Sequence, residues 1–440
     1  MKRIIAVILA IILILPALAS AAGDDQAAAP LTVIEQLYQG EYQQVFDQST
    51  ADVQAALGSA DSLAGLWVQI AQVYGAYQGI TAAAAQEQDG STVAQITCAH
   101  TAADITYTVV LNSGGLLSGL TVSNVVQKVA ESTADTSQFV TEAITLRAGE
   151  ADETQGILTL PLGNGPFPAV IMMQGSGASD MNETAYGIAI FRDIAENLAL
   201  AGVASIRYDK YTYVHADLLT NSFTVQEEYM IDAGDALALL QADSRIGDIY
   251  LLGHSLGAML IPRVMQTLGA EHFTGGVMLD GTPLPLWEIQ YHQNLEVIAT
   301  LDESDREASQ AMIDAELAKL ETMPDMTDEE LQNSLFFGIS AWYQMDLMSV
   351  DAAQTAIAVQ KPLFITQGGK DWQVTPADGL DAWREALGDS LAASYHLYPD
   401  MTHMLCDLEG EPACNTSDYQ AGSTVSLALT RDIAAWILGE

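Results

Sequence analysis

The sequence predicts an α/β fold with a mostly parallel sheet, preceded by a smaller α+β domain. From about residue 142 onward, short apolar stretches alternate with amphipathic helical stretches. This alternation is typical of buried parallel strands whose crossover helices cover both faces of the sheet. Before that point, helical spacing comes first and short alternating stretches follow it, which indicates an independent α+β unit.

The first residues have the three parts of a secretory signal peptide. Lys2 and Arg3 supply a positive start, an unbroken apolar run covers 4–15, and small residues at 19–21 offer a cleavage site. The alternative is a membrane anchor, but the apolar run is shorter than the ~20 residues that a helical span needs. We therefore expect residues 1–21 to be removed, the protein to be secreted or held at the cell surface, and no stable membrane insertion afterwards.

The chain is strongly acidic. With 15 Lys and Arg against 57 Asp and Glu, its formal net charge is −42. Such a field repels nucleic acid and anionic surfaces, and it disfavours polyanionic substrates. We interpret the charge as a source of solubility outside the cell, with a specific cationic partner or adaptation to salt as alternatives.

Three cysteines are present, and export would make a disulfide permissible. Cys406 and Cys414 lie close together in a loop that contains Gly and Pro, so they are the natural pair. Cys98 is then left over, and we expect it to be a small buried residue on a strand. No group of Cys and His has the spacing of a zinc site, and neither a metal nor an organic cofactor is indicated.

Residues 31–126 form the predicted small domain. Apolar residues recur at helical spacing over 31–38 and 63–77. Four alternating stretches follow, at 80–85, 93–99, 105–111 and 116–122, with glycine-containing turns after the first and the third. Residues 127–141 are polar and rich in Ser and Thr, which favours a linker.

Residues 142–440 contain the predicted eight-stranded sheet. Its expected strands lie at 144–147, 157–161, 169–174, 203–208, 249–253, 276–280, 362–367 and 394–398. The expected helices lie at 188–201, 225–242, 257–268, 376–387 and 425–438. At about 285–350 the alternation stops, with no strand signal and several Trp, Tyr and Met residues. We interpret this stretch as a helical cap above the carboxyl ends of the strands, with an ordinary helical excursion as the alternative.

The strongest motif is Gly253-His254-Ser255-Leu256-Gly257, which follows a predicted strand and opens a predicted helix. That context is typical of the nucleophile elbow of α/β-hydrolases, in which a tight turn lifts the serine hydroxyl above the sheet. Strand and helix approach closely there, which explains glycine on either side of Ser255. The alternative is a structural Gly-Ser turn.

A nucleophilic serine needs a base within hydrogen-bond reach and an acid that orients the base. In this fold the acid and then the histidine follow the serine. His403 lies in a loop after the last predicted strand, whereas His396 lies inside that strand, so His403 is the expected base. Asp371 follows the preceding strand and is the expected acid, with Asp346 and Asp400 as alternatives.

Negative charge that develops on a reacting carbonyl must meet backbone N–H donors. One expected donor is the amide of Leu256, which follows the serine. The other is the amide of Ser176, in the loop Gln174-Gly175-Ser176-Gly177 that follows a predicted strand. A plain glycine loop is the alternative at this position.

Taken together, these stretches resemble bacterial α/β-hydrolases described as acyl-ester hydrolases, close to the dienelactone-hydrolase and prolyl-oligopeptidase-like branches. The matching stretches are 173–177 with 180–184, 205–210, 253–257, 367–374 and 398–403. The resemblance covers about residues 140–440 and gives Ser255, Asp371 and His403 the roles of a catalytic triad. The N-terminal part resembles a small cystatin-like domain that precedes such hydrolases in secreted Gram-positive proteins.

One departure from the family pattern follows Lys210. Relatives commonly continue there with Arg and Gly, whereas this chain has Tyr211, so the loop does not indicate a substrate. Arg207 and Asp209 are expected to tie down the neighbouring loop rather than to perform chemistry.

These observations predict a secreted serine hydrolase that cleaves carboxylic esters through an acyl-enzyme, without a cofactor. The aromatic and methionine-rich cap favours a small-molecule ester with an apolar acyl or aryl group. One alternative is a serine peptidase of the prolyl-oligopeptidase-like type, although the sequence has no large propeller-like N-terminal domain. The other is a non-catalytic binding protein on a hydrolase scaffold. The sequence does not indicate an oligomeric state.

Overall fold

The computed structural model describes residues 24–299 and 303–440. The chain divides into two compact units, and the boundary lies between Ala130 and Glu131. The predicted signal peptide lies outside the described residues. Within them, no helix is long and apolar enough to cross a membrane.

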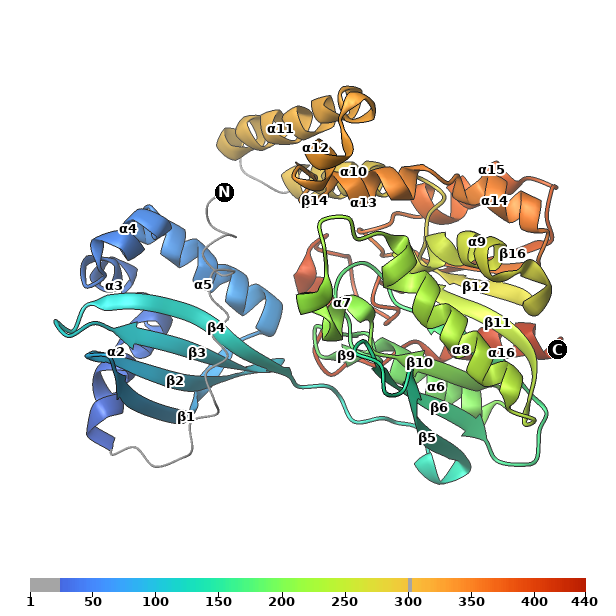
Figure 1. Ribbon diagram of the computed structural model, residues 1–440, viewed down its shortest axis with the longest axis horizontal. Helices are drawn as coiled ribbons and strands as arrows, with labels where there is room; N and C mark the ends of the chain where they lie inside the picture. The colour runs from blue at the N-terminus through green and yellow to red at the C-terminus, as the bar shows by residue number, and fades with distance from the viewer. Residues whose placement is uncertain (1–23, 300–302) are drawn as a thin grey trace. The chain divides into compact units, whose positions relative to one another are not determined.

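The first unit combines helices with a four-stranded antiparallel sheet (Figure 1). Its described helices are α2 (Asp24–Tyr38), α3 (Tyr42–Asp47), α4 (Ala51–Leu57) and α5 (Ala60–Tyr74). Its strands, in spatial order, are β1 (Tyr77–Gln88), β2 (Ser91–His100), β3 (Ala103–Leu111) and β4 (Leu117–Gln127). Every second residue of β3 is buried, because one face of the sheet packs in a common core with helix residues such as Leu37 and Leu63.

Two details of this unit differ from the prediction. Helices α3 and α4 are present but have only six and seven residues, too few for a clear apolar period. Helix α5 ends at Tyr74, three residues before the predicted end, because Gly75 follows with φ 78°. Between the units, β4 ends at Gln127 and the next strand begins at Phe139, inside the predicted linker.

The second unit is built on an eight-stranded sheet. In spatial order its strands are β16 (Ala393–Tyr398), β15 (Leu363–Gly368), β12 (Gly275–Leu279), β11 (Ile246–His254), β7 (Phe167–Met173), β10 (Ala204–Tyr208), β6 (Thr154–Pro161) and β5 (Phe139–Leu146). Neighbouring strands from β16 to β10 run parallel, whereas β6 and β5 pair antiparallel at one edge. The arrangement is the predicted α/β-hydrolase fold.

Helices cover both faces of this sheet (Figure 1). The covering helices are α8 (Ile231–Ala242) and α9 (Leu256–Leu268) on one face, and α6 (Ile190–Leu200) and α16 (Leu427–Leu438) on the other. Along β7, Ile171 packs in the core under α8 and α9, whereas Val170 and Met172 pack in the core under α6 and α16. Each such buried side chain contributes about 1.5–3 kcal/mol, which accounts for the continuous apolar run of this strand.

The interruption after β12 is helical, as predicted, but it also contains a hairpin. Its described elements are α10 (Leu286–Ala299), α11 (Glu303–Leu317), α12 (Asp328–Gln332), β13 (Leu335–Phe336), β14 (Ile339–Ser340) and α13 (Ala341–Met348), and α14 (Ala352–Val359) follows. The expectation of no strand here is therefore wrong. Two-residue strands have no detectable period, and the positive φ angles of Phe337 and Gly338 form the tight turn between them.

Cys406 and Cys414, the natural pair for a permissible disulfide, both carry free thiols in this structure. The Cys406 side chain is buried and donates to the carbonyl oxygen of Met404 at 3.3 Å. Proximity in sequence does not fix the direction of a side chain, and a disulfide needs both sulfurs to face each other. Cys98 is buried on β2, as predicted.

We therefore expect all three cysteines to be reactive thiols once the protein is unfolded without reductant. Titration with a thiol reagent in denaturant should count three equivalents per chain. The Cys414→Ser variant, as a control, should lose one equivalent and should keep its melting temperature with or without reductant. One thiol instead of three in the unmodified chain would show that a disulfide forms.

Candidate active site

Ser255 lies on a strained turn between β11 and α9. Its φ of 54° and ψ of −119° fall outside the regions that a serine usually adopts, at a cost of about 1–3 kcal/mol. A Cβ atom on Gly253 would lie 2.4 Å from the backbone of Gly257, and one on Gly257 would lie 2.2 Å from the carbonyl oxygen of Met173. Strand, turn and helix therefore pack backbone against backbone, as the motif predicts.

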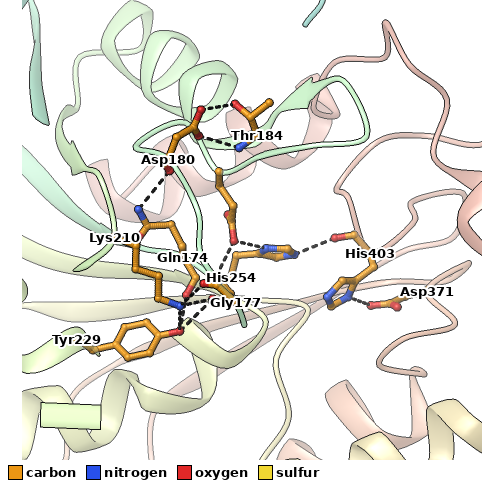
Figure 2. A network of polar contacts seen from close by, with 11 residues as sticks. Gln174, Gly177, Asp180, Thr184, Lys210, Tyr229, His254, Asp371 and His403 are labelled. Carbon is orange, nitrogen blue, oxygen red and sulfur yellow. Dashed lines mark hydrogen bonds and ion pairs between the residues drawn. The ribbon is translucent and has the colours of Figure 1, made fainter. Parts of the chain in front are cut away.

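His403 and Asp371 form a buried hydrogen-bonded pair (Figure 2). Nδ1 of His403 lies 2.7 Å from Oδ2 of Asp371, and since a carboxylate only accepts, Nδ1 carries the proton. The backbone N–H groups of Gln373 and Val374 donate to the other carboxylate oxygen at 2.8 and 2.9 Å. Asp371 is thus fixed at the end of β15 and leaves Nε2 of His403 available for another partner.

Ser255 and His403 line one cavity of about 320 Å³. Within the described chain, the Ser255 hydroxyl makes no hydrogen bond to His403. A direct bond is not required in the absence of substrate, because such contacts often tighten only when the substrate binds. The structure therefore brings all three predicted residues to one place, with Asp371 behind His403.

The alternative residues lie in other interactions. Asp346 pairs with Arg263 at 2.8 Å, and Asp400 pairs with Lys370 at 2.7 Å. His396 is exposed on β16, where its ring lies 4.7 Å from that of Phe364. None of the three is among the residues that line the cavity with Ser255.

The loop after β7 lies directly against the turn at Ser255. A Cβ atom on Gly175 would lie 3.1 Å from the Cβ of Ser255, and Ser176 lines the same cavity. In the described structure, neither the N–H of Ser176 nor that of Leu256 donates to another group of the chain. Leu256 is the first residue of α9, where N–H groups have no partner within the helix. Two donors are therefore available beside Ser255.

Arg207 and Asp209 hold the neighbouring loop, as expected. The guanidinium of Arg207 donates to the side chain of Asn182 at 3.1 Å, and burial lowers its pKa to about 10. The carboxylate of Asp209 accepts from the N–H of Met181 at 2.8 Å.

Comparison with known proteins identifies the family of the chain. Residues 185–411, more than half of the chain, match the family described as serine aminopeptidase, S33. The chain belongs to this family. Residues 31–120, which lie in the first unit, match a domain described as a protein of unknown function, DUF3887.

One relative of this S33 family member, and two similar solved structures, are esterases by name. Esterase EstD of Thermotoga maritima is 31% identical over 283 residues, which cover 64% of this chain and 65% of the relative. Est1E from Butyrivibrio proteoclasticus, a solved structure, is 14% identical with a TM-score of 0.44, covering 68% of this chain and 98% of Est1E. The structure of the Pyrococcus furiosus esterase Pf2001 is 14% identical with a TM-score of 0.39, covering 63% of this chain and 88% of Pf2001.

A second buried pair, which the sequence does not reveal, lies beside that of His403 and Asp371 in the second unit (Figure 2). Nδ1 of His254 lies 3.0 Å from Oε1 of Glu183, and Nε2 lies 2.8 Å from the carbonyl oxygen of His403. Both partners only accept hydrogen bonds, so both nitrogens of His254 must donate and the ring is an imidazolium. Burial lowers the pKa of His254, but the charge and hydrogen bond of Glu183 outweigh it and raise the pKa. The only sequence signal is the position of His254 within the elbow.

Asp280 is a second buried carboxyl group beside the pair of His403 and Asp371. It directly follows β12, and its Oδ1 accepts from the N–H of Gly368 at 3.1 Å. One of its carboxylate oxygens, one of those of Asp371 and a ring nitrogen of His403 all lie within 4.8 Å of one another. Burial and the charge of Asp371 raise its pKa well above the ordinary value. Among the described residues these three could approach a metal ion, but a protonated Asp280 and the engaged Nδ1 of His403 favour hydrogen bonding instead.

Replacement of Gly257 by alanine tests the close packing at the elbow. The new Cβ would lie 2.2 Å from one backbone oxygen and 2.6 Å from another, so the turn must shift. We expect the free energy of unfolding to fall by about 2–4 kcal/mol, measured by chemical denaturation. The control is Gly65→Ala in α5, where a Cβ meets nothing within 4 Å and alanine should be neutral or stabilising. Equal effects of the two substitutions would contradict this packing.

Replacement of Asp280 by asparagine tests its protonation. The raised pKa means that the folded state keeps a proton that the unfolded state releases above pH ~4, so wild-type stability falls as pH rises towards the folded pKa. Asparagine has no such proton, and its amide can still donate towards Asp371. Chemical denaturation at pH 5 and pH 8 should therefore show the wild type losing stability relative to the variant by up to about 1.4 kcal/mol per pH unit. Parallel pH profiles would show that Asp280 is ionised.

Proposed function

We propose that this S33 family member is an exported serine hydrolase that cleaves small carboxylic esters through an acyl-enzyme. The observation that carries the proposal is the convergence of Ser255, His403 and two unused backbone N–H groups on one cavity. The similarity to esterase EstD supports an ester as substrate. Export rests on the signal-peptide pattern of residues 1–21.

In the proposed reaction, Oγ of Ser255 attacks the ester carbonyl carbon and its proton moves to Nε2 of His403. The N–H groups of Leu256 and Ser176 stabilise the oxyanion of the tetrahedral intermediate. The intermediate collapses as the C–O bond breaks, and the leaving alkoxide takes the proton from His403. Water then attacks the acyl-enzyme with His403 as base, which releases the acid and restores Ser255. Asp371 holds the tautomer of His403 and stabilises its charged form.

The cavity lining favours a small, uncharged acyl or aryl group. Its apolar lining includes the side chains of Met259, Leu286, Ile289 and Ile339, which lie beside the neutral amides of Gln290 and Gln293. Among the described residues that line it there is no Lys or Arg, and the imidazolium of His254 is already paired with Glu183, so an anionic substituent would find no free counter-charge. The net charge of −42 disfavours polyanionic substrates in the same direction.

Replacement of Ser255 by alanine tests the proposal. We expect kcat for p-nitrophenyl acetate to fall by at least about 10⁴-fold, because the nucleophile is lost while the fold remains. The control, Ser417→Ala, changes an exposed serine outside the cavity and should keep full activity. Wild-type protein should also bind a fluorophosphonate probe covalently, and the Ser255→Ala variant should not.

The same assays separate the alternatives. Faster turnover of an aminoacyl amide than of the matching aminoacyl ester would favour the peptidase activity that the family description names. Absence of both turnover and fluorophosphonate labelling in the wild type would favour a non-catalytic binding protein.

A further inference from the structure

The buried ammonium group of Lys210 contacts the loop on either side of Ser176 (Figure 2). Nζ of Lys210 lies 2.6 Å from the carbonyl oxygen of Gly175 and 3.0 Å from that of Gly177. The hydroxyl of Tyr229 lies 2.8 Å from the same Nζ and 3.0 Å from the carbonyl oxygen of Gly175. The side chain of Lys210 is only 1% exposed, so this cation contacts buried groups of the protein and not solvent.

These contacts fix the direction of the Ser176 amide. In a planar trans peptide, the C=O of one residue and the N–H of the next point in opposite directions. Because the Gly175 carbonyl points towards Lys210, the N–H of Ser176 must point away from Lys210. Ser176 also lines the cavity beside Ser255, so this direction suits a donor to a reacting carbonyl oxygen.

Gly175 is held at its other end as well. Its N–H donates to Oε1 of Glu183 at 2.5 Å, and the same oxygen contacts the imidazolium of His254. Both peptide groups of Gly175 are therefore tied to buried charged side chains. The positive charge of Lys210 also polarises the peptide whose N–H faces the cavity, which strengthens that donor.

A series of buried polar contacts connects Lys210 to the cap. Nζ of Lys210 lies 2.5 Å from Oε1 of Glu228, which belongs to a π-helical turn at Gln226–Met230. The hydroxyl of Tyr343, on cap helix α13, donates to the other oxygen of Glu228. Glu228 and Tyr343 are buried, and π-helical turns are frequent at functional sites. One chain of contacts thus joins the cap to the Ser176 amide.

We propose that Lys210 is a positioning residue for the oxyanion-binding amide of Ser176, and that Tyr343 of the cap supports it through Glu228. This inference rests on the proposed hydrolase function. It adds that the cap controls the rate of the chemical step, and not only the shape of the substrate cavity.

The test compares Lys210→Met and Tyr343→Phe with Arg147→Met in the full chain. Arg147 is a matched control, because it also forms an ion pair with a buried carboxylate, Asp232, at 2.7 Å, but its hydrogen bonds go to Asp152, Thr154 and Asp235 and not to the loop of Ser176. For each variant, kcat and KM are measured with p-nitrophenyl acetate. The inhibition constant of a trifluoromethyl ketone, whose adduct places an oxyanion at the amides, is measured in parallel.

Lys210→Met should lower kcat by roughly 10–100-fold, less than loss of an oxyanion donor, and change KM by less than about threefold. It should weaken the trifluoromethyl ketone by a similar factor. Tyr343→Phe should show the same pattern at roughly 3–10-fold, since one hydrogen bond to Glu228 is lost. Arg147→Met should lower the melting temperature and leave kcat and inhibitor affinity unchanged.

Three results would overturn the proposal. One is an unchanged kcat in Lys210→Met, and another is a rise in the KM of Lys210→Met without a fall in its kcat. The third is a lower kcat in Tyr343→Phe with unchanged affinity for the trifluoromethyl ketone. This third result is sufficient by itself if Lys210→Met does not fold. An inactive wild type would instead refute the hydrolase function itself, so the two failures are distinguishable.

Discussion

The site depends on the close approach of three backbone segments at the start of α9. Gly253 and Gly257 allow β11, the helix and the end of β7 to touch without side chains between them. This contact holds Ser255 in a conformation that a serine avoids, and it places the loop with Gly175 against it. The first N–H groups of α9 then face the same space as the serine hydroxyl. Any change that separates these segments displaces nucleophile and donors together.

Around this contact, each of three buried carboxylates pairs with a basic side chain. Asp371 faces His403, Glu183 faces His254, and Glu228 faces Lys210. Removing one partner from such a pair leaves a buried charge without compensation, at about 3–5 kcal/mol. The loops that carry these residues are therefore fixed relative to one another. The pairs add little net stability, but they keep the site in one geometry before substrate arrives.

The sequence predicts the parts of the site that obey local rules. The glycines of the elbow and the strand ends before Asp371 and His403 are visible in the sequence, because each needs a particular backbone at a particular place. The contact between His254 and Glu183 joins residues 71 positions apart and depends on tertiary packing that no local pattern encodes. The free thiol of Cys406 also depends on tertiary packing, whereas the two-residue strands of the cap escape prediction because they are too short to show a period.

The cap takes part in two features of the site at once. Helix α10 supplies Leu286, Ile289, Gln290 and Gln293 to the cavity, while α13 supplies Tyr343 to Glu228. If the cap moved away, an oxygen of the buried Glu228 would lose its hydrogen bond, at a cost of about 1–3 kcal/mol. That cost opposes opening and favours the arrangement in which Lys210 holds the Gly175 carbonyl. The shape that selects the acyl group and the geometry of the oxyanion donors therefore vary together, because both depend on where the cap sits.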